Sequence, residues 1–251
     1  MRVQRYFWVL LFSISLTACA GNRTSSSGGS EAAEINMRLG INYMQRGDYK
    51  FALEKLEKAL QQDPNLASAH NTIALLYQRL DENDKAEKHF KKAVALEPDY
   101  SEAQNNYGVY LCQQQRYDEA EAKFLLAVEN PLYLSVAQAY ENAGLCALQK
   151  PDLAKAEGYF RRALQYQPTL GKSLLRMAEI SYEQQNYLQA RGYIQRFHSA
   201  ATWTPRALLT GIKIENKLGD EDAVASYVLI LRSRFPDSDE MQMVNQGIAN
   251  L

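Results

Sequence analysis

From residue 33 onward, small and large apolar residues recur at a spacing of about 34 residues, with polar positions between them. A first column of small residues contains Gly40, Ala74, Gly108, Gly144 and Ala178. A second column contains Ala52, Ala86, Ala120, Ala156 and Ala190, and a large apolar residue follows each of its members four positions later. Those large residues are Leu56, Phe90, Phe124, Phe160 and Ile194. Because residues three or four apart share a helix face, the pattern predicts amphipathic helices in a repeat array.

The period divides this part of the chain into six expected repeats. Their predicted boundaries are 33–66, 67–100, 101–136, 137–170, 171–204 and 205–238, and residues 239–251 are expected to form a C-terminal capping helix. Pro64 and Pro98 are 34 residues apart, whereas Pro98 and Pro168 are 70 apart. The two extra residues fall near "ENPLYLSV" (129–136), where we expect a lengthened turn. One repeat cannot bury its apolar face alone, so neighbouring repeats must stack.

Two segments resemble the tetratricopeptide repeat: "LGINYMQRGDYKFALEKLEKALQQDP" (39–64) and "IALLYQRLDENDKAEKHFKKAVALEP" (73–98). The fifth and sixth repeats depart from the pattern, since Phe197 replaces a small residue and Gly211 and Ile212 disturb the first column. The resemblance implies an all-α fold, a right-handed superhelix of helix-turn-helix repeats whose first helices line the concave side.

Two lines of residues are expected to face the concave groove, from the family pattern. The first line is Met37, Asn71, Asn105, Glu141 and Leu175, and the second line is Ile41, Leu75, Val109, Leu145 and Glu179. Apolar anchors on the second line and the amides of Asn71 and Asn105 suit the binding of a peptide segment. The lysine and asparagine clamp that some relatives use for a C-terminal carboxylate is absent in register. The alternative interpretation is that these side chains pack between repeats.

The first twenty residues have the pattern of an export signal. Arg2 and Arg5 precede an apolar run over 6–16, which is too short to span a bilayer. "LTAC" (16–19) resembles the bacterial lipobox, which implies cleavage before Cys19 and lipid modification of that residue. We therefore expect a signal peptide over 1–18, a flexible tether over the Ser- and Gly-rich residues 19–32, and a lipid anchor at Cys19. Because Ala20 follows the cysteine, the periplasmic face of the outer membrane is the expected location.

The composition and the remaining motifs indicate a binding protein and not an enzyme. The formal net charge is −1, which predicts no nucleic-acid partner. The only histidines, His70, His89 and His198, have no metal-ligand spacing, and no catalytic constellation is present, so we expect no metal, cofactor or small-molecule substrate. Cys112 and Cys146 fall on first helices of adjacent repeats. Two buried free thiols are the favoured expectation, and a disulfide is the alternative.

Taken together, the lipobox, the short tether and the six repeats are similar to the type IV pilus biogenesis and stability lipoproteins, the pilotins of the secretin. This resemblance implies that the chain binds the secretin subunit and promotes its outer-membrane localisation and multimer assembly. The alternative is a scaffold lipoprotein of another envelope machine, for outer-membrane protein insertion or cell-wall synthesis.

Overall fold

The computed structural model describes residues 26–150 and 152–247, which form thirteen α-helices. The first helices of the six repeats are α1 (Ser26–Gln45), α3 (Ala67–Arg79), α5 (Ser101–Gln113), α7 (Val136–Ala147), α9 (Gly171–Glu183) and α11 (Pro205–Leu218). The second helices are α2 (Tyr49–Gln62), α4 (Asn83–Leu96), α6 (Tyr117–Glu129), α8 (Leu153–Tyr166), α10 (Tyr187–Ala200) and α12 (Glu221–Arg234). A short helix, α13 (Asp239–Asn245), follows them.

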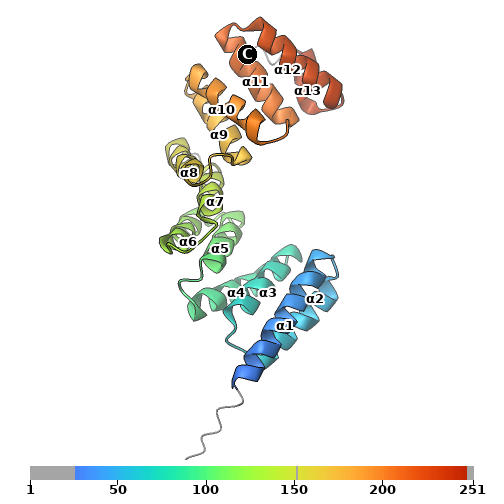
Figure 1. Cartoon of the computed structure of the whole chain (residues 1–251), viewed down its shortest axis with the longest axis vertical. Coiled ribbons are helices and arrows are strands. Elements are labelled where there is room, and N and C mark those ends of the chain that lie inside the picture. The colour runs from blue at the N-terminus through green and yellow to red at the C-terminus, as the bar shows by residue number, and fades with distance from the viewer. Residues whose placement is uncertain (1–25, 151, 248–251) are drawn as a thin grey trace, which may run out of the picture.

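Each first helix pairs with the second helix that follows it, and the pairs stack into an elongated, curving array (Figure 1). No strand occurs among the described residues, so the predicted all-α fold of helix-turn-helix repeats is confirmed. The short α13 packs against α11 and α12 at the C-terminal end. A capping helix is expected there because the last repeat would otherwise expose an apolar face.

The columns of small and large residues pack against each other inside each repeat. Gly108 on α5 lies against the ring of Phe124 on α6, and a Cβ at position 108 would come within 2.7 Å of that ring. Phe124 itself is 2% exposed. The contact shows why a small residue is needed once in each period, since a larger one would force the two helices apart.

The turn after most first helices contains one residue with a left-handed backbone. These residues are Gly47, Asp81, Gln115, Gln185 and Gly219, with φ between 58° and 81°. Glycine adopts this conformation without strain, and a residue of this kind ends a helix by reversing the chain direction. The regular use of one turn geometry keeps successive helix pairs in similar orientation.

The turn between the third and fourth repeats is longer than the equivalent turns elsewhere. α6 ends at Glu129 and α7 begins at Val136, which leaves the six residues 130–135, whereas four residues (63–66) separate α2 from α3. The two extra residues of the period therefore lie in this turn, which we call the long turn. The flanking helices α6 and α7, with 13 and 12 residues, are each one residue shorter than most helices of their kind.

The N-terminal region differs from the sequence-based expectation at one point. The tether was expected over 19–32, but α1 begins at Ser26 and includes residues 26–32. Ala33 is fully buried against Ala59 and Ala69, so the first turns of α1 continue a helix that is already fixed by packing. Residues 1–18 and Cys19 lie outside the described residues. Within residues 26–150 and 152–247, no helix combines the length and apolar character needed to cross a membrane.

The buried side chains form several separate clusters along the array. The largest cluster extends from Ala156 to Met241 and joins the last three repeats. The second and third repeats share another cluster around Phe90 and Phe124, and a smaller cluster around Leu56 joins the first repeat to the second. The core is therefore continuous at the C-terminal end and divided at the N-terminal end.

Candidate partner-binding groove

The first helices form the inner surface of the curved array. Among the described residues, successive first helices contact each other directly, as α1 does α3, α3 does α5, α5 does α7 and α9 does α11. Successive second helices make no comparable contacts within that part of the chain. The side on which neighbours approach most closely is the concave side, so the first helices line the groove.

The second line lies on this concave surface with its side chains partly accessible. Ile41, Leu75, Val109 and Leu145 are all half-buried, one on each of the first four first helices. Val109 and Leu145 line a hollow of about 400 Å³ between α5 and α7, which Tyr117 and Asn142 also border. The four apolar residues thus present a broken apolar stripe with a recess near its end, which suits a peptide with apolar anchors.

The first line is largely buried between the repeats, which corrects its expected exposure in the groove. Asn71, Asn105 and Glu141 are 5%, 8% and 2% exposed. Each makes a hydrogen bond to the following repeat. Asn106 Nδ2 donates to Asn71 Oδ1 (3.3 Å), Asn142 Nδ2 donates to Asn105 Oδ1 (3.0 Å), and Ser173 Oγ donates to Glu141 Oε2 (2.8 Å). Met37 and Leu175 are half-buried. The polar members of this line hold neighbouring repeats together, as the alternative interpretation proposed.

Cys112 and Cys146 form a disulfide between α5 and α7, with their Cα atoms 5.8 Å apart. This corrects the favoured expectation of two free thiols. The two cysteines occupy adjacent first helices that pack side by side, so their side chains meet within bonding distance. The bond borders the hollow that contains Val109 and Leu145, and it ties the third repeat to the fourth at that place.

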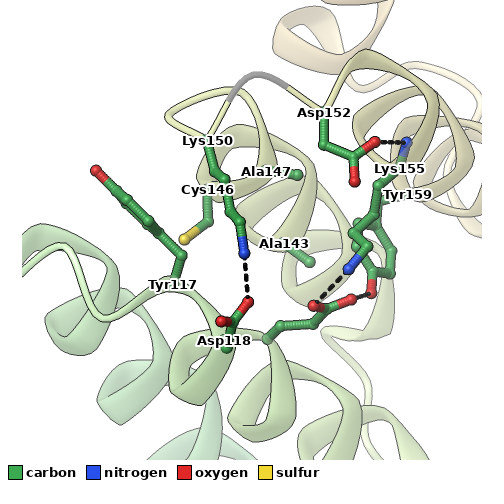
Figure 2. Close-up of a pocket in the computed structure, with 10 residues that line it drawn as sticks. Tyr117, Asp118, Ala143, Cys146, Ala147, Lys150, Asp152, Lys155 and Tyr159 are labelled. Atoms are coloured by element: carbon green, nitrogen blue, oxygen red, sulfur yellow. Dashed lines mark hydrogen bonds and ion pairs between the residues drawn. The ribbon is translucent and has the colours of Figure 1, made fainter.

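A smaller hollow lies on the other side of Cys146, between α6, α7 and α8 (Figure 2). Lys150 Nζ donates to Asp118 (2.9 Å), and Lys155 Nζ donates to Glu121 (2.9 Å). The hydroxyl of Tyr159 also donates to Glu121, and burial together with this carboxylate raises the pKa of Tyr159. The enclosed volume is about 40 Å³, room for about one water molecule. These residues therefore join the third repeat to the fourth.

In the last two repeats the groove contains ion pairs. The sequence pattern gave one sign of this, the charged residue Glu179 in the second line. Arg206 on α11 donates to both oxygens of Glu179 on α9, at 2.6 and 2.9 Å. Arg176 donates to the same carboxylate at 2.8 Å. A hollow of about 280 Å³ adjoins this ion-pair network and is also lined by Lys213. The second line is therefore apolar over the first four repeats, and at Glu179 it becomes part of an ion-pair network between α9 and α11.

His70 and His89 pair with each other between α3 and α4. Within the described part of the chain, no group of three or more His, Cys, Asp or Glu residues is placed to bind a metal ion. His70 and His89 contact each other through their Nδ1 atoms at 2.9 Å, and His70 Nε2 contacts the carbonyl oxygen of Pro64 at 3.1 Å. Since Nε2 of His70 must donate to that carbonyl, its Nδ1 accepts from His89. Burial lowers the pKa of both rings.

The comparisons with known proteins agree with this architecture. Models of the tetratricopeptide repeat match residues 31–99, 71–133 and 127–170. The chain is thus a tetratricopeptide-repeat protein. It is 34% identical over 239 residues to the type IV pilus assembly protein PilF of Pseudomonas aeruginosa, across 93% of this chain and 95% of that protein. The chain belongs to the family of PilF and PilW type IV pilus biogenesis factors.

Solved structures support the same grouping. A structure of Pseudomonas aeruginosa PilF superposes with a TM-score of 0.81 at 34% identity and covers 88% of this chain and 99% of its own. The crystal structure of PilW, described as a widely conserved type IV pilus biogenesis factor, gives a TM-score of 0.75 at 33% identity, with 84% and 97% covered. MamA, at 20% identity and a TM-score of 0.57 over 68% of this chain and 92% of its own, shares the fold.

Proposed function

We propose that this chain is a lipid-anchored outer-membrane protein of type IV pilus biogenesis that binds the secretin subunit and promotes its localisation and multimer assembly. Membership of the PilF and PilW family supports the link to the pilus. The lipobox ending at Cys19 supports the anchor. The observation that carries the binding role is the apolar stripe of Ile41, Leu75, Val109 and Leu145 along the concave surface.

The mechanism is binding without catalysis. A secretin segment with apolar side chains at suitable intervals would bury them against the stripe, while its polar backbone faces the rest of the groove. Holding this segment near the membrane raises its effective concentration for assembly there. It also covers apolar surface that would otherwise aggregate before the multimer forms. No group in the groove needs to change its covalent bonds for this role.

The groove is tested by placing charge on the stripe. Leu75→Asp and Val109→Asp, alone and combined, should weaken crosslinking of the chain to the secretin subunit in membranes and reduce the amount of secretin multimer. Leu188→Asp is the matched control, because Leu188 lies on a second helix and is 73% exposed. Thermal unfolding of each variant establishes that the fold is intact. Undiminished secretin crosslinking in folded stripe variants would refute the groove as the binding surface.

The anchor is tested separately. Cys19→Ala should move the chain from the outer-membrane fraction to the soluble periplasmic fraction and leave secretin subunits unassembled. Cys19→Ala chains that still bind secretin in solution would show that anchoring and binding are independent contributions. Normal multimer assembly with a soluble chain would contradict the proposed role of the anchor.

A further inference from the structure

The long turn displays two leucines to solvent. Leu132 is 83% exposed and Leu134 is 99% exposed, which makes them the two most exposed large apolar side chains in the described part of the chain. The two extra residues of the repeat period lie in this same turn. Exposing two leucines together raises the free energy of the unbound protein surface, so such a pair indicates a contact site.

The turn that carries these leucines is held in one shape. Asn130 Oδ1 accepts a hydrogen bond from the backbone N–H of Leu132 (2.9 Å), and the carbonyl of Asn130 accepts one from Tyr133 (3.1 Å). Tyr133 is 9% exposed and packs with Val136 against the end of α6. Because the residue between the leucines is fixed, they are presented on a preorganised support, which reduces the entropy lost on binding.

The surroundings of the leucines carry negative charge. Leu132 and Leu134 border a hollow of about 380 Å³ between the long turn and the turn before α5. Glu97, Asp99 and Glu102 also line it, and neither lysine nor arginine does. The hollow thus combines an apolar contact with three carboxylates.

We infer that this surface binds a polypeptide segment in which an apolar side chain is flanked by lysine or arginine. The apolar side chain would pack between Leu132 and Leu134, and the basic groups would pair with the three carboxylates. A bilayer suits the surface less well, because the carboxylates repel anionic headgroups. The site lies at the N-terminal end of α7, roughly 13 Å along the helix from Leu145 in the groove. The inference is independent of the proposed secretin-binding role.

The test uses short probe peptides and the full chain. One peptide has a single phenylalanine flanked by lysines in a Gly/Ser background, a second has glutamates in place of the lysines, and a third has serine in place of phenylalanine. NMR titration should show the first peptide binding at least about tenfold more tightly than the other two, with shifts at residues 97–102 and 130–135. The double variant Leu132→Ser/Leu134→Ser should weaken this binding about tenfold or more, and the control Leu188→Ser should not.

Three results would overturn the inference. Equal binding of the three peptides, or binding of none, would remove the chemistry assigned to the partner. Shifts confined to the concave groove would place the binding elsewhere. Binding of phosphatidylcholine and phosphatidylglycerol vesicles that is lost in the double variant would make the leucines a membrane contact. Because both leucines are exposed, the double variant should keep the wild-type unfolding transition.

Discussion

The carboxylate of Glu141 on α7 accepts hydrogen bonds from the backbone N–H (3.1 Å) and the hydroxyl (2.8 Å) of Ser173 on α9. Ser173 lies in the first turn of α9, whose own N-cap residue, Leu170, has no capping side chain. A carboxylate at this place satisfies a free helix N–H and interacts favourably with the helix dipole. One repeat therefore caps the first helix of the next.

We expect Glu141→Ala to lower the free energy of unfolding by about 2–3 kcal/mol, because a buried N–H and a hydroxyl lose their partner. Glu141→Gln keeps an acceptor oxygen but loses the charge, so its loss should be about 1 kcal/mol. Urea unfolding measures both, with the exposed Glu129→Ala as control. A Glu141→Ala chain that unfolds at the wild-type urea concentration would mean that the interface does not depend on this cap.

Replacing two helical glycines, Gly108 and Gly158, by alanine should change the free energy of unfolding in opposite directions. Gly108→Ala places a Cβ within 2.7 Å of the buried Phe124 ring and should destabilise the fold by about 1–3 kcal/mol, despite the better helix propensity of alanine. Gly158 on α8 has open space around it, so Gly158→Ala should stabilise the fold by about 0.5–1 kcal/mol. Thermal and urea unfolding of the two variants and the wild type measure both changes. Stabilisation by both substitutions would show that the helix pairs move apart at little cost.

Reduction of the Cys112–Cys146 disulfide should lower the stability of the array. The two cysteines are 34 residues apart in sequence, and a crosslink over a loop of this size stabilises by about 3–4 kcal/mol in the chain-entropy description. Unfolding is measured with and without dithiothreitol. The Cys112→Ser/Cys146→Ser variant serves as control, and its stability should not respond to the reductant. Equal stability of the oxidised and reduced wild-type chain would contradict this prediction.

The paired histidines should make stability depend on pH in a mildly acidic range. Burial, with His70 and Lys88 nearby, lowers the pKa of His89 to about 4, whereas an unfolded histidine titrates near 6.5. Between these values the unfolded chain binds more protons, so the stabilisation is complete above about pH 6.5 and is lost as the pH falls toward 4. For this partly exposed ring the loss should be on the order of 2 kcal/mol.

The histidine effect is separable from that of the carboxylates. Although burial opposes it, hydrogen bonds from Lys91 and Arg116 lower the pKa of Glu87 from 4.5 to about 2. Its stabilisation is therefore lost mainly as the pH falls from about 4.5 to 2, which lies below pH 5. Urea unfolding at pH 7.5 and pH 5 should differ less for His89→Gln than for the wild type. His198→Gln, at an exposed ring stacked on Trp203, should retain the wild-type difference. The same pH dependence in His89→Gln would assign it to other groups.

Most of the architecture could be predicted from the sequence, because the repeat packs the same small and large residues at each turn of the array. The contact between Gly108 and Phe124 requires a fixed spacing within one repeat, and the same spacing recurs along the amino-acid sequence. The long turn was likewise predictable, since the period there increases by two residues.

Features that depend on the fit between repeats were not predictable in this way. Whether Asn105 faces the groove or the next repeat depends on the rotation between successive helix pairs, which no local spacing encodes. The disulfide depends on the same rotation, because it brings Cys112 and Cys146 together. The exposure of Leu132 and Leu134 follows from Tyr133 taking the buried position between them, and "LYL" in the sequence does not distinguish these three side chains.

The division of the core into clusters gives the array unequal mechanical stiffness. A pulling force along the axis acts on all the repeat interfaces in series, and the interface with the least buried apolar contact extends first. The last three repeats share one large cluster, whereas only a small one joins the first repeat to the second. We therefore expect the first repeat, nearest Cys19 in sequence, to separate under a lower force than the last three repeats, which should extend as one unit.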